Sequence, residues 1–328
     1  MRSESDTNRD TSKPTRTHVV IIDGTLSSLE PGEETNAGLA YKLISELGSD
    51  VPVHYIEGLQ GNNLRTFIAI LTGRGINSQI REAYGYLASR YKPGDRIFLL
   101  GFSRGGYAVR SLAGIIDRIG LLRADHATSR NIRNAYRYYE CAPDSDASQR
   151  FAQLHCYEHI PIKMIGVWDT VKSLGINAPV LWRLTLARNA FHNHELGDSV
   201  ESGFQALAMN ETRVAYSPIM WGNKPEWSGQ LEQMWFRGAH GDVGGQIGRH
   251  KKSRPLSNIP LVWILEKVES CGLQLPDNWR DRYPQDADAP ATGTRSGAAR
   301  VFIMRKRRTI CALPSERIHP SVRRDQQT

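Results

Sequence analysis

Ser103 is the residue of this chain whose surroundings most clearly favour chemistry. It lies at the centre of Gly101-Phe-Ser-Arg-Gly105, which fits the pattern G-x-S-x-G. The apolar run at residues 97–100 predicts a buried strand before it, and apolar residues at helical spacing over 107–116 predict a helix after it. A sharp turn between the two raises a serine hydroxyl above the sheet, at the positive end of the helix dipole. Ser103 is therefore a candidate nucleophile, with a purely structural turn as the alternative.

A serine hydroxyl attacks only with a base within hydrogen-bond reach and an acid that orients the base. Asp169 directly follows the apolar run 162–168, and His240 follows the run 233–236 and a short turn. Enzymes with this serine turn carry their triad in the chain order Ser, Asp or Glu, His, which is the order of these three residues. We expect Asp169 to fix the tautomer of His240, and His240 to accept the proton of Ser103.

Each of these residues has a plainer interpretation. Asp169 precedes Thr170 and can serve as a helix N-cap. Asp242 is the nearest rival for the acid, although its closeness in sequence to His240 favours a cap or a loop-ordering role. The glycine-rich stretch 238–245 can instead cradle a phosphate.

A tetrahedral intermediate also needs hydrogen-bond donors for its oxyanion. The backbone N–H of Arg104, directly after the nucleophile, is one candidate, and Gly24-Thr25 after the first predicted strand supplies the other. Asp23-Gly-Thr is similar to the D-x-D-G-T motif of haloacid-dehalogenase-type phosphatases, but their nucleophilic position is Ile21 here and cannot attack phosphorus. The Arg104 side chain either attracts an anionic head group or forms a surface salt bridge.

The elements that must position these residues alternate between strands and helices. Strands are predicted at 18–22, 51–56, 97–100, 162–168 and 233–236, and helices at 37–47, 77–91, 123–158 and 260–269. This order predicts an α/β-hydrolase-like fold, with a mostly parallel central sheet and helices on both faces. Sites in such sheets lie at the carboxyl ends of the strands, where the candidate residues fall. Residues 177–195 are either a helical lid or an ordinary packed helix.

Three regions are expected along the chain. Residues 1–17 form a polar, disordered leader, residues 18–275 form the catalytic domain, and residues 276–328 form a linker, an edge strand at 301–304 and a basic tail. No signal peptide and no apolar run of ~18 residues occurs. A cytoplasmic location is expected, with secretion without a signal left open.

The net charge of +8 and the pI of about 9.4 indicate either a solvated basic surface or attraction to anionic partners. The late clusters 305–308 and 323–324 favour a solvated, arginine-rich surface over contact with an anionic membrane surface. No nucleic-acid-binding pattern occurs, so no such partner is expected. The four cysteines are scattered, which predicts reduced thiols without a metal site. No cofactor is expected.

Several motifs in order carry a family resemblance over roughly residues 19–273. They are Ile22-Asp-Gly-Thr25, the stretches 101–114 and 167–171, the stretch 206–213 with Pro218 and Trp221, and the stretch 235–245. On these motifs the chain resembles the DUF2235 family, the α/β-hydrolase domain of type VI secretion phospholipase effectors of the Tle1 type.

The resemblance implies Ser103 as nucleophile, Asp169 as acid and His240 as base, acting on lipid esters, with phospholipids as the substrate class in the effector branch. Glu211 and Arg213 lie in a family motif and are candidates for supporting the site, with a buried structural ion pair as the alternative. The membrane-engaging region of the effectors has no counterpart in the residues that follow, which leaves a toxin role open. A serine esterase or lipase working through an acyl-enzyme is the leading hypothesis, and a non-catalytic binding or scaffold protein on the same fold is the alternative.

Overall fold

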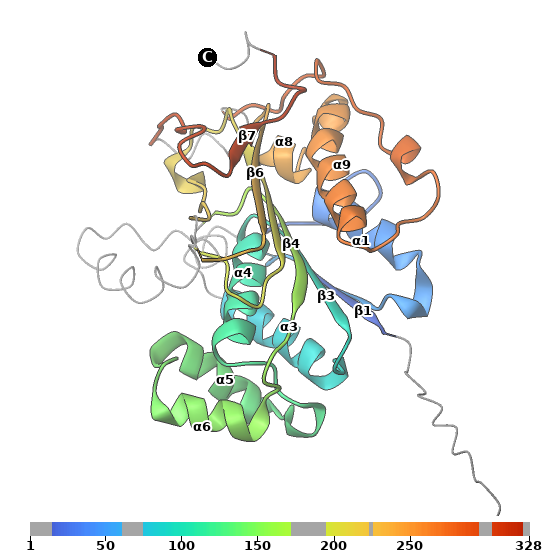
Figure 1. The fold of residues 1–328 in the computed structure, drawn as a ribbon. Helices are drawn as coiled ribbons and strands as arrows, with labels where there is room; N and C mark the ends of the chain where they lie inside the picture. The colour runs from blue at the N-terminus through green and yellow to red at the C-terminus, as the bar shows by residue number, and fades with distance from the viewer. Residues whose placement is uncertain (1–14, 61–74, 172–194, 223–225, 295–303, 324–328) are drawn as a thin grey trace, which may run out of the picture.

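The central element of the fold is a seven-stranded sheet in which every strand pair is parallel. The computed structural model describes residues 15–60, 75–171, 195–222, 226–294 and 304–323. The strand order is β2-β1-β3-β4-β5-β6-β7 (Figure 1). The bounds are β1 Thr17–Ile22, β2 Val53–Ile56, β3 Arg96–Phe102, β4 Ile162–Trp168, β5 Ser202–Ala208, β6 Gln230–Phe236 and β7 Glu316–Ile318.

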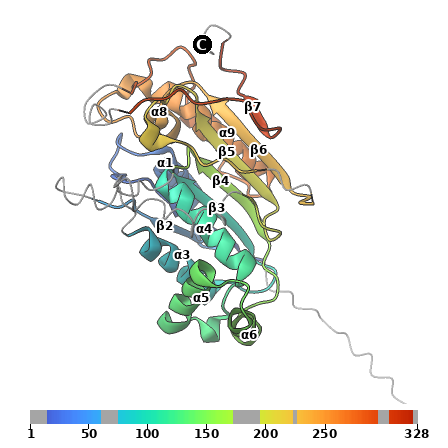
Figure 2. The ribbon, with the colours of Figure 1, turned by 90° about the vertical axis from the view of Figure 1, so that its left-hand side faces the viewer.

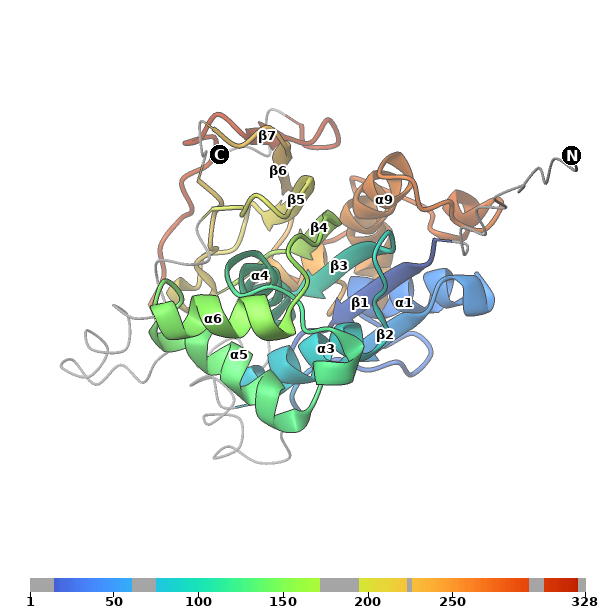
Figure 3. The same ribbon diagram turned by 60° about the horizontal axis from the view of Figure 1, so that its bottom comes forward.

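Helices cover both faces of the sheet (Figure 3). One face carries α3 Ile76–Arg90, α4 Arg104–Arg118, α5 Ser129–Cys141 and α6 Asp146–His155, and the other carries α1 Asn36–Ser45, α8 His240–Gly244 and α9 Arg254–Ser270. The strands alternate between the two apolar cores, since Val20 and Ile22 join one core and Val19 and Ile21 the other. In Figure 2 the first group of helices lies in front of the twisted sheet. The predicted two-faced α/β fold is confirmed.

The strands differ from the prediction mainly on the far side of β4. β5 was missed, so the strand predicted at 233–236 is β6, the sixth in the chain. β1 begins at Thr17, inside the expected leader. No helix among the described residues is long and apolar enough to cross a membrane.

The region after residue 275 is more closely packed than a linker. Trp279 and Ala289 are buried in the core that α9 helps to form, and β7 pairs with β6 at the edge of the sheet. The catalytic-domain boundary predicted at 275 therefore leaves out residues that pack on that domain. Of the edge strand predicted at 301–304, only residue 304 lies within the described residues. Of the lid or packed helix predicted at 177–195, only Glu195 does.

The crossing of β3 by α4 is close enough to require glycine. A Cβ atom added at Gly105 would lie 2.0 Å from the carbonyl oxygen of Ile22, and one added at Gly101 would lie 2.7 Å from the backbone of Gly105. The two glycines of the serine motif are thus explained by backbone-to-backbone packing of β1, β3 and α4.

We expect Gly105→Ala to destabilise the fold by about 3 kcal/mol, because the new methyl group meets backbone that cannot move independently. Gly85→Ala is the matched control, since it also lies in a helix but its methyl group would meet only the tip of Ile132, at 2.9 Å. Urea unfolding of both variants measures the difference. Equal stabilities of the two variants would contradict this account of the crossing.

Candidate active site

Ser103 lies in a strained turn at the carboxyl end of β3. Its backbone has φ 58° and ψ −119°, and α4 begins at the next residue. Its N–H donates to the carbonyl of Trp168 at 2.9 Å, which ties the turn to β4. A non-glycine residue in such a conformation costs about 1–3 kcal/mol and persists only where its surroundings enforce it.

His240 and Asp169 lie next to this serine, as predicted. His240 Nε2 is 2.9 Å from Ser103 Oγ, and His240 Nδ1 is 2.6 Å from Asp169 Oδ2. His240 is the first residue of α8, and Asp169 directly follows β4 with φ 42°. The imidazole packs between the rings of Phe102 and Tyr216, at centroid distances of 4.9 and 4.6 Å. Three strand ends therefore bring together a hydroxyl, an imidazole and a carboxylate that are separated by up to 137 residues.

Asp169 is fully buried and has a cationic neighbour, Arg308, in addition to His240. The Arg308 guanidinium donates to Oδ1 at 2.6 Å and to Oδ2 at 3.0 Å, and the N–H of Ala208 donates to Oδ1 at 3.0 Å. Burial alone would raise the pKa of Asp169, but the Arg308 charge and the His240 hydrogen bond hold the pKa well below its usual value. Asp169 accepts from a neighbouring strand rather than from a helix terminus, so its observed contacts are not those of an N-cap.

Arg308 was missed as a site residue. The run 305–308 is basic throughout, and nothing in its pattern distinguishes Arg308 from the three cations before it. Only the folded chain, in which residues 304–323 return to the site, separates them.

Asp242 orders the loop that carries His240. Its carboxylate accepts from the N–H of Ala239 and from the N–H of Thr292, each at 2.8 Å. Burial raises the pKa of this carboxyl above its ordinary value. This is the loop-ordering role weighed in the sequence analysis.

Glu211 and Arg213 form an ion pair and also contact the site. Arg213 donates to Glu211 through Nε at 2.8 Å and through Nη2 at 2.6 Å. Glu211 in turn accepts from the backbone N–H of His240 at 3.1 Å. The Arg213 guanidinium lies 4.0 Å from the ring centroid of Tyr216, which packs on the imidazole. The pair thus supports His240 from its backbone and from its ring.

The loop after β1 approaches the serine turn closely. A Cβ atom on Gly24 would lie 2.5 Å from the ring of Phe102, so this position requires glycine. The N–H of Gly24, which was predicted as an oxyanion donor, donates to Asp23 Oδ1 at 2.6 Å. The N–H groups of Thr25 and Arg104 stay as the predicted donors.

Asp23 is buried among three donors. Thr35 Oγ1 and the Tyr55 hydroxyl donate to its Oδ2 at 2.6 and 2.7 Å, in addition to the Gly24 N–H. Burial outweighs these hydrogen bonds and raises the pKa of Asp23 to about 6. The carboxylate fixes the loop that faces the serine turn.

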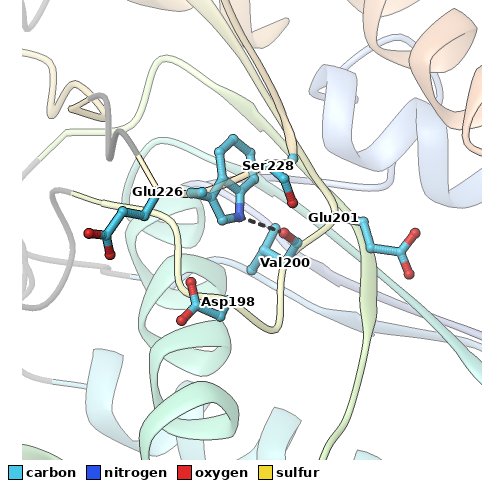
Figure 4. Close-up of a pocket in the computed structure, with 7 residues that line it drawn as sticks. Asp198, Val200, Glu201, Glu226 and Ser228 are labelled. Atoms are coloured by element: carbon cyan, nitrogen blue, oxygen red, sulfur yellow. Dashed lines mark hydrogen bonds between the residues drawn. The ribbon is translucent and has the colours of Figure 1, made fainter.

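Two cavities flank the described sheet, and neither is lined by Ser103. One of about 470 Å³ lies at the amino ends of β5 and β6, with three carboxylates around Trp227, whose indole N–H donates to Val200 (Figure 4). It lies at the sheet edge opposite the serine. The other, of about 320 Å³, is lined by Asn210, Arg237, Ala239, Ala291, Gly293 and Thr294, beside the loop that carries His240.

The fold and the site describe an α/β protein with a serine, histidine and aspartate clustered at the carboxyl edge of a parallel sheet. Residues 16–267 match the family model described as "T6SS, Phospholipase effector Tle1-like, catalytic domain". The chain belongs to this family of Tle1-like catalytic domains, as the motif resemblance predicted.

Individual relatives are more distant. An uncharacterized protein of Saccharomyces cerevisiae is 27% identical over 198 residues, which are 52% of this chain and 29% of that protein. A structure of the Tle1 effector bound to the VgrG spike of the type 6 secretion system is 18% identical and covers 77% of this chain and 57% of its own, with a TM-score of 0.41. An uncharacterized protein from Pseudomonas aeruginosa, also with a TM-score of 0.41, is 15% identical and covers 86% of this chain and 52% of its own. The chain thus spans between 29% and 57% of the length of these proteins.

The raised pKa of Asp23 predicts a pH-dependent stability. The ordinary value is 3.8 and the folded value about 6, so between these pH values the folded state binds more protons than the unfolded state. The free energy of unfolding therefore falls as the pH rises through this window, by about 3 kcal/mol relative to Asp23→Asn, which cannot ionise.

Urea unfolding of both proteins from pH 4 to pH 7 measures this difference. Asp50→Asn, at an exposed position, is the control and should show no such trend. A difference between the wild type and Asp23→Asn that stays flat or grows with pH would contradict the prediction.

Proposed function

We propose that this protein is a serine hydrolase that cleaves carboxylic esters of lipids, with phospholipids as the substrate class. One observation carries the proposal: Ser103, His240 and Asp169 form a continuous chain of hydrogen bonds of 2.9 and 2.6 Å at the sheet edge. The family membership supports a lipid-ester substrate.

In the proposed reaction Asp169 accepts from His240 Nδ1–H, which leaves Nε2 as the acceptor for the Ser103 proton. Ser103 Oγ attacks the ester carbonyl while its proton passes to Nε2. The tetrahedral intermediate collapses as His240 returns that proton to the leaving alcohol, and the acyl group stays on Ser103. Water, deprotonated by the same nitrogen, then releases the fatty acid and regenerates the serine.

The developing oxyanion would accept from the N–H groups of Arg104 and Thr25. Arg104 begins α4, where the backbone N–H groups point away from the helix and carry partial positive charge. Thr25 belongs to the loop that packs on Phe102, next to Ser103. Two donors on separate elements are what oxyanion stabilisation requires.

Two side chains near the serine suit a lipid. The Arg104 guanidinium is largely buried, and this burial lowers its pKa to about 10, so it stays charged at neutral pH and can attract a head-group phosphate. Leu26 is 42% exposed in the same loop as Thr25 and offers apolar surface to an acyl chain. These features support an anionic, amphipathic substrate.

The scaffold alternative predicts a serine and a histidine too far apart for a hydrogen bond. The separation of 2.9 Å between Oγ and Nε2 does not meet that expectation and favours catalysis.

Covalent labelling tests the nucleophile. A fluorophosphonate probe should label the wild type at Ser103, and Ser103→Ala should lose labelling and lower ester turnover by at least about 10⁴-fold. Peptide mass mapping locates the label. The control is Ser111→Ala, which changes a serine further along α4. This variant should be labelled like the wild type. An unlabelled but folded wild type, or turnover retained in Ser103→Ala, would remove the proposal.

A lipid panel tests the substrate class. Phosphatidylglycerol, phosphatidylcholine, a triacylglycerol and a short soluble ester are compared as substrates, with Ser103→Ala as blank. We expect the highest kcat/KM for a phospholipid, and Arg104→Gln should lower kcat/KM for the anionic phospholipid more than for the soluble ester. A preference for the soluble ester would retain the hydrolase and reject the lipid assignment.

A further inference from the structure

Arg308 reaches the site from residues 304–323, the C-terminal segment, which lies beyond the part of the chain matched by the family model. We infer that Arg308 is a positioning residue for the proposed hydrolysis: its guanidinium holds the Asp169 carboxylate in the orientation that directs Oδ2 at His240. This inference rests on the proposed function and names a residue that the triad needs.

The contacts of Asp169 leave it one orientation. Its Oδ1 accepts from Arg308 Nη1 and from the Ala208 N–H, and its Oδ2 accepts from Arg308 Nη2 and from His240 Nδ1. A planar guanidinium that donates to both oxygens fixes the plane of the carboxylate as well as its position. Rotation of the carboxylate away from His240 would break both bonds to Arg308.

Arg308 is itself held in place. Its Nη1 also donates to the carbonyl of Ala208 at 2.7 Å, and its Nη2 donates to the carbonyl of Tyr216. Only 5% of its side-chain surface is exposed. The guanidinium therefore joins the end of β5, the loop under the His240 ring and the catalytic carboxylate in one network.

The backbone of the C-terminal segment explains how Arg308 arrives. Residues 304–306 lie against residues 212–214, with the Val214 N–H donating to Met304 at 3.1 Å and the Lys306 N–H donating to Thr212 at 2.7 Å. Further along, β7 pairs with β6. Arg308 is thus anchored on both sides, and in Figure 1 this segment runs over the end of the sheet near α8.

Charge gives Arg308 a second effect. Asp169 is fully buried, and a buried carboxylate without a counter-charge is strongly unfavourable. Arg308 makes the largest contribution to holding the pKa of Asp169 down, against the effect of burial. The carboxylate can then stay ionised near neutral pH and accept from His240.

The two carboxylates that accept hydrogen bonds from His240 are each paired with an arginine. The charged and titratable groups around the imidazole, besides Ser103, are Arg104, Asp169, Glu211, Arg213, Tyr216, Asp242 and Arg308. Glu211 is paired with Arg213 as Asp169 is with Arg308. Removal of Arg308 leaves one uncompensated negative charge beside the ring, which favours the protonated imidazole, the form that cannot act as base.

The experiment compares Arg308→Gln, which loses the charge, with Arg308→Lys, which keeps the charge but cannot donate to both carboxylate oxygens through a planar guanidinium. Arg305→Gln is the matched control, because Arg305 lies in the same segment but donates to Thr212 Oγ1 instead of Asp169. Turnover of a soluble ester is measured from pH 5 to pH 9, and thermal unfolding shows that each variant is folded.

We expect Arg308→Gln to lower kcat on the order of 10²-fold with little change in KM. Its acid limb should also shift to higher pH. Arg308→Lys should lower kcat but keep the acid limb of the wild type, and Arg305→Gln should behave like the wild type. A purely structural anchor would lower stability without moving the acid limb. Unchanged kcat in Arg308→Gln, or in Arg308→Lys if Gln does not fold, would overturn the inference.

A second measurement separates this inference from the proposed function. The hydrogen-bonded proton between His240 Nδ1 and Asp169 should give a far-downfield proton NMR signal in the wild type that is weakened or lost in Arg308→Gln. This signal does not depend on turnover. An inactive, unlabelled wild type rejects the proposed function, whereas an active wild type with an identical signal in Arg308→Gln rejects only the role of Arg308.

Discussion

Burial of the Asp169 carboxylate is the constraint around which this site is built. The Asp169 carboxylate has no solvent contact, and a buried carboxylate is tolerated only if a cation compensates its charge and hydrogen-bond donors occupy its lone pairs. Here the donors come from β5, from the start of α8 and from the C-terminal segment. The strand register contributes to this arrangement, because Phe102 pairs with Trp168, so Ser103 and Asp169 directly follow paired residues of β3 and β4.

The same edge of the sheet concentrates backbone strain. Leu26, Ser103 and Asp169 are non-glycine residues with positive φ, and all three lie within four residues of a strand end. Close packing around Gly24, Gly101 and Gly105 leaves these turns no room to relax. The strain is therefore a product of how tightly three strand ends converge, and it presents the side chains above the sheet.

Much of this arrangement could be predicted from the sequence, because it depends on local patterns. The apolar runs before Asp23, Ser103 and Asp169 locate the ends of three strands, and the parallel α/β order implies that those ends meet. β5 was missed because Ser202–Ala208 contains a glycine, a glutamine and two alanines, and its burial depends on neighbours on both sides. Arg308 could not be found, since its role is set by a contact across 139 residues and not by its own neighbours in the chain. The hydrogen bond from the Gly24 N–H to Asp23 likewise could not be predicted, because it depends on the rotamer of the Asp23 side chain.

The path of the C-terminal segment has a consequence for the order in which the protein matures. During synthesis the strands β1 to β6 leave the ribosome well before residues 304–318, and domains begin to fold as they emerge. Until Arg308 arrives, Asp169 would lack this counter-charge, and the proposed orientation toward His240 would form only once residues 304–318 have docked. A site completed in this way would form late, when the rest of the core is already packed.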